Sequence, residues 1–230
     1  QFMFKKLSNI GDCGIVCDFG DEVNKIINSH VINLFNYINN EISNEKLKGI
    51  LNCTPSYNKL IINFDLKITN TNKIFDFLKS VDFSKLTSKK KNKEWNIPIC
   101  YDFEMDLGNI NKILKLDKEE IISIHLNTVF FIYMIGFVPG HPFMGDLDPK
   151  LFLKRLETPR VKIPAGSVGI VEKFCNIYPY ESPGGWNIIG RTPEKLFNKN
   201  DSKKPCLLSP GDTVKFKSIS KDEFEKLNYE

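Results

Sequence analysis

The stretch Thr158–Thr192 reads TPRVKIPAGSVGIVEKFCNIYPYESPGGWNIIGRT, and the rest of the sequence is best understood as its support. Its 35 residues include 5 glycines and 4 prolines, interleaved with arginine, serine, tyrosine and tryptophan. Because proline fixes φ and glycine tolerates positive φ, this density predicts closely specified turns between short strands. Polar and aromatic side chains carried on such turns are typical of recognition surfaces. We therefore expect the functional site in this stretch.

Composition and charge exclude several classes of protein. With 230 residues, of which 41% are hydrophobic, the chain is long enough for two domains with real cores. The net charge of +4 is mild, and basic and aromatic residues do not gather on one predicted face, which argues against nucleic-acid binding. The N-terminus lacks the apolar region of a signal peptide, and the longest apolar run, Val129–Val138, is interrupted by Gly136. We expect a soluble cytoplasmic protein with no membrane partner.

The 6 cysteines stand at positions 13, 17, 53, 100, 175 and 206. No CxxC pair occurs, and no histidine lies at metal-ligand spacing from any of them. We expect no metal site, and we expect the cysteines to be reduced, buried and apolar in character.

The first part of the chain predicts a small α/β sandwich domain over residues 1–84. The predicted elements are a strand at Gly14–Phe19, a helix from Asp21, strands at Leu47–Thr54 and Lys59–Phe64, and a helix at Thr71–Ser80. Residues 85–94 lose periodicity and become strongly basic, which predicts a solvated linker.

The second part predicts a closed or nearly closed β-barrel over residues 95–230, and the fold class is therefore α+β. The predicted elements are strands at Trp95–Tyr101, Thr128–Ile135 and Thr213–Ile219, and a helix that begins at Asp117 with a capping box closed by Glu120. Before the last strand, turn signals recur between short β-rich runs, which is typical of a barrel of short strands. They are Pro139-Gly140, Asp148-Pro149, Pro164-Ala165-Gly166, Pro183-Gly184-Gly185 and Pro210-Gly211-Asp212.

Several motifs together resemble one known family. They are Gly11-Asp12, Phe19-Gly20-Asp21-Glu22, Pro55-Ser56-Tyr57, Ile97–Tyr101, Tyr133–Phe137, Thr158-Pro159-Arg160, Ile163–Val168, Ile177-Tyr178-Pro179, Ser182–Trp186, Gly190-Arg191-Thr192 and Leu207–Asp212. The chain resembles, nearly from end to end, the family of the 5-oxoprolinase B subunit and the KipI-type inhibitor of a sporulation sensor kinase. This family is similar to part of the carboxyltransferase domain of urea carboxylase.

The resemblance implies a cyclophilin-like barrel and a component of an ATP-dependent 5-oxoprolinase, with ATP and Mg at the level of the complex. A homologous C subunit and an A subunit would be the partners, and 5-oxoproline would be opened to glutamate at a composite site. The chain would be inactive alone. It departs from the family pattern at His141, where an aromatic residue is usual, and at Cys175-Asn176, where a Thr-Gly pair is usual.

The predicted catalytic residues are Arg191, Arg160, Glu181, Ser182 and Tyr178. The two arginines could bind phosphate or carboxylate in a bidentate manner, or could bridge loop carbonyls as structural residues. Glu181 could act as a base or could be solvated. The predicted pocket residues are His141, Pro164, Gly166, Ser167, Gly184, Gly185, Trp186 and Thr192.

The aromatic and histidine side chains could each have a structural role or a role in the site. Tyr178 and Trp186 could wall a pocket or belong to the barrel core. His125 lies on a predicted helix among isoleucines, and we expect a structural role for it. His141 lies in a Pro- and Gly-rich loop and is the better candidate for acid–base chemistry.

Two alternatives come from other functional classes. As in the KipI-type relative, the chain could bind and inhibit a histidine kinase. A carboxyl-transfer component would require biotin on a lysine in a Met-Lys-Met context, and the sequence lacks that motif.

Overall fold

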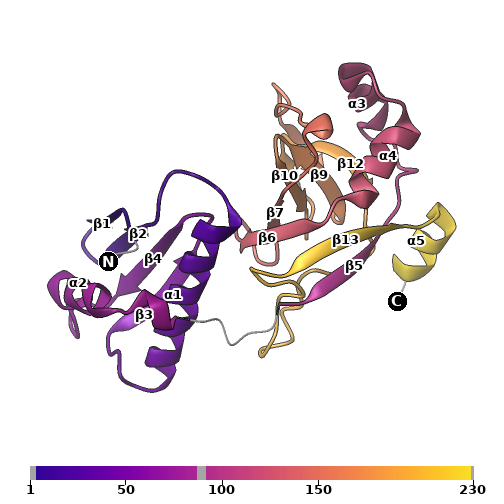
Figure 1. The fold of residues 1–230 in the computed structure, drawn as a ribbon. Coiled ribbons are helices and arrows are strands. Elements are labelled where there is room, and N and C mark those ends of the chain that lie inside the picture. The colour runs from indigo at the N-terminus through magenta and orange to yellow at the C-terminus, as the bar shows by residue number, and fades with distance from the viewer. Residues whose placement is uncertain (1–3, 87–91, 229–230) are drawn as a thin grey trace. The chain divides into compact units, whose positions relative to one another are not determined.

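A computed structural model of the chain describes residues 4–86 and 92–228 (Figure 1). The chain forms two compact units, Gln1–Lys91 and Asn92–Glu230. The middle of the predicted basic linker, residues 87–91, lies outside the described residues. Next to it, Phe83–Lys85 forms a short 3-10 helix, η1.

The first unit is a four-stranded antiparallel sheet with two helices (Figure 1). The strands are β1 (Lys6–Asn9), β2 (Gly14–Asp18), β3 (Ile50–Pro55) and β4 (Lys59–Phe64), in the order β1-β2-β4-β3. The helices are α1 (Lys25–Ser43) and α2 (Thr71–Ser80). Every predicted element of this unit is present. The sheet also contains β1, a four-residue edge strand without a buried side chain, which gave no hydrophobic signal.

The first helix packs its apolar stripe on this sheet. Val31, Leu34 and Ile38 are fully buried, at the spacing expected for one face of a helix. The helix begins later than the Asp21 start expected from the pattern, because the side chain of Asn24 accepts a hydrogen bond of 2.9 Å from the backbone N–H of Ile27.

The second unit is built on a seven-stranded sheet. Its strands are β5 (Glu94–Ile99), β6 (Phe130–Ile135), β7 (Pro142–Gly145), β9 (Ser167–Val171), β10 (Phe174–Ile177), β12 (Asn187–Arg191) and β13 (Thr213–Ser218). Their order is β12-β9-β10-β7-β6-β13-β5, and β13 pairs in parallel with β5. A separate two-stranded sheet pairs β8 (Arg160–Ile163) with β11 (Ser182–Gly184).

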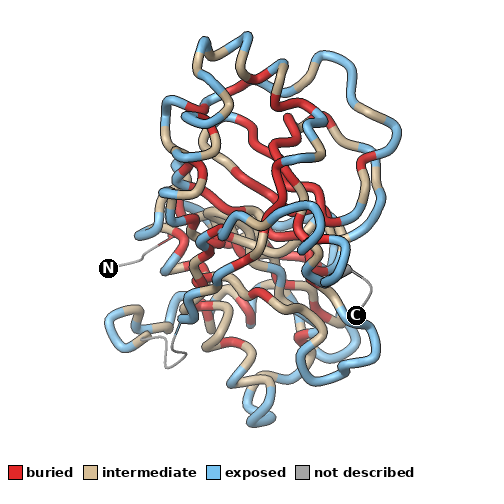
Figure 2. The backbone as a smooth tube through the Cα atoms, turned by 90° about the vertical axis from the view of Figure 1, so that its right-hand side faces the viewer, coloured by how far each residue is buried: buried red, intermediate tan, exposed pale blue. Residues whose placement is uncertain are grey.

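The two ends of the seven-stranded sheet meet and nearly close the barrel. The backbone N–H of Cys100, directly after β5, donates to Arg191 O on β12 at 2.8 Å, and the Arg191 N–H donates to Cys100 O at 2.9 Å. Side chains from all around this barrel form one buried core. In Figure 2 the buried positions run through the interior and the exposed ones lie mostly at the outer bends of the tube. The predicted nearly closed barrel is therefore present, whereas its cyclophilin-like character stays a prediction.

Helices α3 (Leu107–Leu114), α4 (Lys118–Asn127) and α5 (Lys221–Asn228) and the 3-10 helix η2 (Pro149–Leu151) complete this unit. Helix α4 follows Asp117 as predicted, but the predicted capping box is wrong because the Asp117 side chain makes no capping hydrogen bond. Helices α3 and α5 were not predicted, since each is only eight residues long.

Two smaller expectations also need correction. Pro183 and Gly184 belong to strand β11 and not to a turn, since Gly184 pairs with Arg160. All six cysteines are free, but only Cys17, Cys100 and Cys175 are buried. No helix of the described residues is long and apolar enough to cross a membrane.

Candidate functional site

A small pocket of about 270 Å³ lies where loops and strands from the Thr158–Thr192 stretch meet β7. It is lined by Phe137, His141, Phe143, Arg155, Val171, Asn176, Tyr178, Pro183, Gly184 and Trp186. Four of these were predicted as site residues, namely His141, Tyr178, Gly184 and Trp186. The lining is mainly aromatic with a few polar groups, which is the usual composition of a small-molecule site.

His141 lines this pocket and is 1% exposed. Its ring stacks on Phe143 with centroids 4.8 Å apart, and Tyr178 meets its edge at 5.2 Å. The distance between Asn176 Nδ2 and His141 Nε2 is 3.0 Å. Burial lowers the pKa of His141 to about 4, so the imidazole is neutral at physiological pH. The two positions at which the sequence departs from the family pattern thus contact each other.

Two glycines make room for these side chains. A Cβ on Gly169 would come within 2.7 Å of Asn176 Oδ1 and 2.9 Å of Trp186 Cβ. A Cβ on Gly184 would collide with the hydroxyl of Tyr178. Burial raises the pKa of Tyr178, so its hydroxyl stays protonated. The glycines are therefore required by close packing around the pocket.

A larger pocket of about 770 Å³ shares Arg155 with the small one. It is lined by Asn109, Ile113, residues 152–158, Arg160 and Asn187. Asn187 Nδ2 donates to Lys154 O at 2.9 Å, and Leu156 N donates to Gly185 O at 2.8 Å, so the segment 152–158 is tied to the barrel.

The guanidinium of Arg160 is held by the buried carboxylate of Asp106 through an ion pair. Asp106 Oδ2 also accepts a hydrogen bond of 2.6 Å from Ile188 N, which fixes the carboxylate on β12. One nitrogen of Arg160, Nη1, is buried without a hydrogen-bond partner. Arg160 therefore has a structural partner and still has donor capacity left.

Arg191 lines neither of these two pockets. Its Cζ lies 4.8 Å from the ring centre of Phe103 and 5.3 Å from that of Phe224. Its Nη2 donates to Ala165 O at 3.1 Å, while Nε is buried without a partner. The cation thus lies against a contacting pair of aromatic rings beside the barrel closure.

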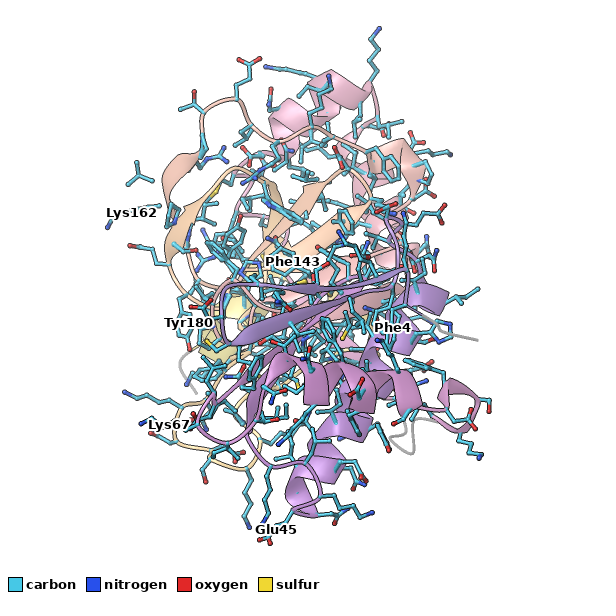
Figure 3. The ribbon with its side chains drawn as sticks, turned by 90° about the vertical axis from the view of Figure 1, so that its left-hand side faces the viewer. Phe4, Glu45, Lys67, Phe143, Lys162 and Tyr180 are labelled. Carbon is cyan, nitrogen blue, oxygen red and sulfur yellow. The ribbon has the colours of Figure 1, made fainter. Side chains whose placement is uncertain are left out.

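Glu181 and Ser182, the other two predicted catalytic residues, also lie outside the lining of both pockets. Glu181 Oε1 pairs with Lys162 Nζ at 3.1 Å, with side chains 58% and 75% exposed, and Lys162 projects outward in Figure 3. Ser182 Oγ is buried without a partner. The structure does not bring the five predicted catalytic side chains to one pocket.

The other predicted pocket residues form the turn that supports the site. Ser167 N donates to Pro164 O at 3.2 Å, and Thr192 N donates to Gly166 O at 2.8 Å. Gly166 has φ of +79°, and a Cβ there would clash with the Thr192 carbonyl. Neither pocket is lined by any of these residues or by Gly185.

Six residues that line the small pocket were not predicted as site residues, namely Phe137, Phe143, Arg155, Val171, Asn176 and Pro183, and neither was Asp106, the partner of Arg160. Arg155 is one of only three arginines in a lysine-rich chain, and that rarity was the available signal. Asp106 gave none, because its partner Arg160 lies 54 residues away. The described residues contain no group of three or more His, Cys, Asp or Glu side chains that could hold a metal ion.

Comparison with known proteins places the chain in a family. Residues 5–208 match the family described as carboxyltransferase domain, subdomain C and D. The chain is 34% identical to the 5-oxoprolinase B subunit of Bacillus subtilis over 95% of both chains. It is 37% identical to the 5-oxoprolinase B subunit of Haemophilus influenzae over 75% of this chain and 78% of that one.

The fold is similar to that of Kluyveromyces lactis urea carboxylase, with a TM-score of 0.72 at 20% identity. That match covers 96% of this chain but only 22% of the urea carboxylase, so this chain corresponds to a small part of the larger enzyme. The sequence matches and the barrel agree, and the chain belongs to the 5-oxoprolinase B-subunit family within the carboxyltransferase subdomain C and D proteins.

Proposed function

We propose that this chain is one component of an ATP-dependent 5-oxoprolinase, a hydrolase that opens the cyclic amide of 5-oxoproline to glutamate. The observation that carries the proposal is the 34% identity to a 5-oxoprolinase B subunit over 95% of both chains. A homologous C subunit and an A subunit would complete the enzyme, and the chain would be inactive alone. ATP, with Mg²⁺, would be a second substrate of the complex.

The need for ATP follows from the stability of the amide. An unactivated amide resists water, and phosphorylation of the lactam oxygen would make its carbonyl carbon electrophilic. Such a step needs cationic groups for the phosphoryl oxygens and a polar site for the lactam. The larger pocket, with Arg160, and the smaller one, with Tyr178, support a division of labour of this kind.

Among the five proposed catalytic residues, Arg160 and Tyr178 have the strongest support. Arg160 lines the larger pocket and has an unused donor in Nη1, which could hold a carboxylate or phosphate oxygen. Tyr178 lines the smaller pocket with its hydroxyl protonated. Arg191, Glu181 and Ser182 remain proposals that need a contribution from a partner surface or a change in side-chain position.

Glutamate release from 5-oxoproline and ATP tests the proposal directly. The chain would be purified together with candidate A and C subunits, and the same mixture without this chain would be the control. We expect turnover only when this chain is present. A complex that assembles fully and releases no glutamate would refute the proposal.

A further inference from the structure

Two residues that line the small pocket, His141 and Asn176, carry buried hydrogen-bonding atoms that the protein itself does not use. His141 and Asn176 are each 1% exposed, and they contact each other through Nε2 and Nδ2. The amide nitrogen is a donor, so Nε2 accepts and the imidazole proton lies on Nδ1. His141 Nδ1 and Asn176 Oδ1 are both buried and have no partner. One donor and one acceptor are left unused, which is costly in a buried place and points to a ligand.

The shape of the pocket limits what the ligand can be. Phe143 stacks on His141 at 22° between ring planes, and Trp186 follows at 6.1 Å from Phe143. Rings held in this way offer flat apolar walls. The volume of about 270 Å³ lies just below the range of drug-sized sites, so the pocket fits a small ring and not a nucleotide.

Arg155 gives the pocket a positive rim. It is exposed and is the only arginine that lines the small pocket. Its guanidinium lies over the chain at Gly185, with Nε 3.6 Å and Nη2 3.7 Å from the position of a Cβ there. A planar guanidinium at the mouth of an apolar pocket is suited to a carboxylate.

We propose that this pocket binds a small cyclic amide that bears a carboxylate, with the ring against the aromatic side chains. His141 Nδ1–H donates to the ring carbonyl, Asn176 Oδ1 accepts from the ring N–H, and Arg155 binds the carboxylate. The assignment of 5-oxoproline as this ligand rests on the proposed function, whereas the donor, acceptor and cation are features of the pocket itself. His141 is then a binding residue and not the acid–base catalyst that its sequence position suggested.

Intrinsic fluorescence of the full chain tests the binding, because Trp186 lines the pocket. The probes are 5-oxoproline, 2-pyrrolidinone, which lacks the carboxylate, and proline, which lacks the ring carbonyl. We expect 5-oxoproline to change the emission, and the two analogues to bind about tenfold more weakly or worse, as expected for the loss of one charged or one buried hydrogen bond. In a Trp186→Phe variant the change in emission should be lost, which would show that the signal comes from Trp186 and not from Trp95.

Three variants separate the contacts. His141→Phe keeps the stacking and removes the donor, Asn176→Leu removes the acceptor, and Arg155→Ala removes the cation at an exposed position. Each should weaken 5-oxoproline binding by about tenfold or more, and Arg155→Ala should abolish the preference over 2-pyrrolidinone. Lys150→Ala, an exposed cation that lines neither pocket, is the matched control and should leave binding within about twofold.

The same variants in the assembled complex distinguish the two proposals. If the complex turns over 5-oxoproline and all three variants keep the wild-type KM, the pocket assignment is overturned while the proposed function stands. If the complex has no turnover but the chain binds 5-oxoproline with the expected sensitivity to the variants, the proposed function fails and the pocket assignment stands. Unchanged binding in all three variants overturns the pocket assignment in either case.

Discussion

The barrel unit buries two histidines, His125 at 0% and His141 at 1% exposed, and burial lowers their pKa values to about 3 and about 4. Their surroundings differ. His125 Nδ1 lies 2.7 Å from the Tyr101 hydroxyl, and Nε2 lies 3.9 Å from Cys175 Sγ. Both nitrogens of His125 are therefore occupied, whereas His141 has one nitrogen without a partner. Burial and a shifted pKa alone do not separate a structural histidine from a binding one, but unused hydrogen-bonding capacity does.

A single strand connects the two histidines. Cys175 and Asn176 are consecutive on β10, and successive side chains of a strand point to opposite faces. Cys175 belongs to the barrel core and contacts His125, while Asn176 lines the pocket and contacts His141. One face of β10 thus packs in the barrel core through Cys175, and the other carries the polar side chain of Asn176 to the small pocket.

Of the changes considered, acidification should lower the free energy of unfolding most, and His125 and His141 should contribute to this loss alike. In the unfolded chain each imidazole takes up a proton below pH 6.5, whereas in the folded chain the rings stay neutral to about pH 3 and 4. Unfolding therefore takes up protons in this window, and the free energy of unfolding falls as the pH is lowered. Each group contributes about 1.4 kcal/mol per pH unit, so we expect a loss of about 4 kcal/mol between pH 7 and pH 5 from the two together.

Urea titrations followed by tryptophan fluorescence measure this loss in the barrel unit alone, because both tryptophans, Trp95 and Trp186, belong to it. The variant His141→Phe should show about half the loss. An equal loss in the variant and in the wild type would mean that His141 is not buried as a neutral ring.

Substitution by alanine, unlike a change in pH, should lower the free energy of unfolding by different amounts at the two histidines. His125→Ala leaves a cavity in the core and an unpaired Tyr101 hydroxyl, so we expect a loss of about 3 kcal/mol in the free energy of unfolding. His141→Ala enlarges a pocket that already exists and removes ring stacking and the hydrogen bond to Asn176, so we expect a smaller loss of about 2 kcal/mol. The same urea titrations at pH 7.5 measure both values. Equal losses would contradict the contrast between a satisfied and an unsatisfied histidine.

The secondary structure could be predicted where one chain segment determines it. The helix at Thr71–Ser80 and the strand at Lys59–Phe64 match their predicted bounds, since apolar periodicity and turn residues mark both. The eight-residue helices α3 and α5 give too short a pattern. Closure of the barrel through Cys100 and Arg191 depends on residues far apart in sequence, and no local pattern reports it.

The sequence indicated which stretch lines the small pocket but not the contacts of its charged residues. The Thr158–Thr192 stretch does supply much of the small pocket, as its glycines and aromatic residues indicated. The partners of the charged residues could not be foreseen, because a sequence does not show that Asp106 holds Arg160 or that Arg191 lies against Phe103 and Phe224. Such contacts decide whether a charge is free for chemistry.

We expect the smallest change in the free energy of unfolding at Glu181, which lies on the exposed surface of the Thr158–Thr192 stretch. Its pair with Lys162 is solvent-exposed on both sides, and exposed ion pairs contribute about 0–1 kcal/mol. Glu181→Gln should therefore change the free energy of unfolding by less than about 0.5 kcal/mol. Lys162→Gln, which removes the other half of the pair, is the matched control. If Glu181→Gln lowers turnover by more than about tenfold while Lys162→Gln does not, the carboxylate itself takes part in the reaction, and a partner protein must bring substrate to this exposed side of the barrel.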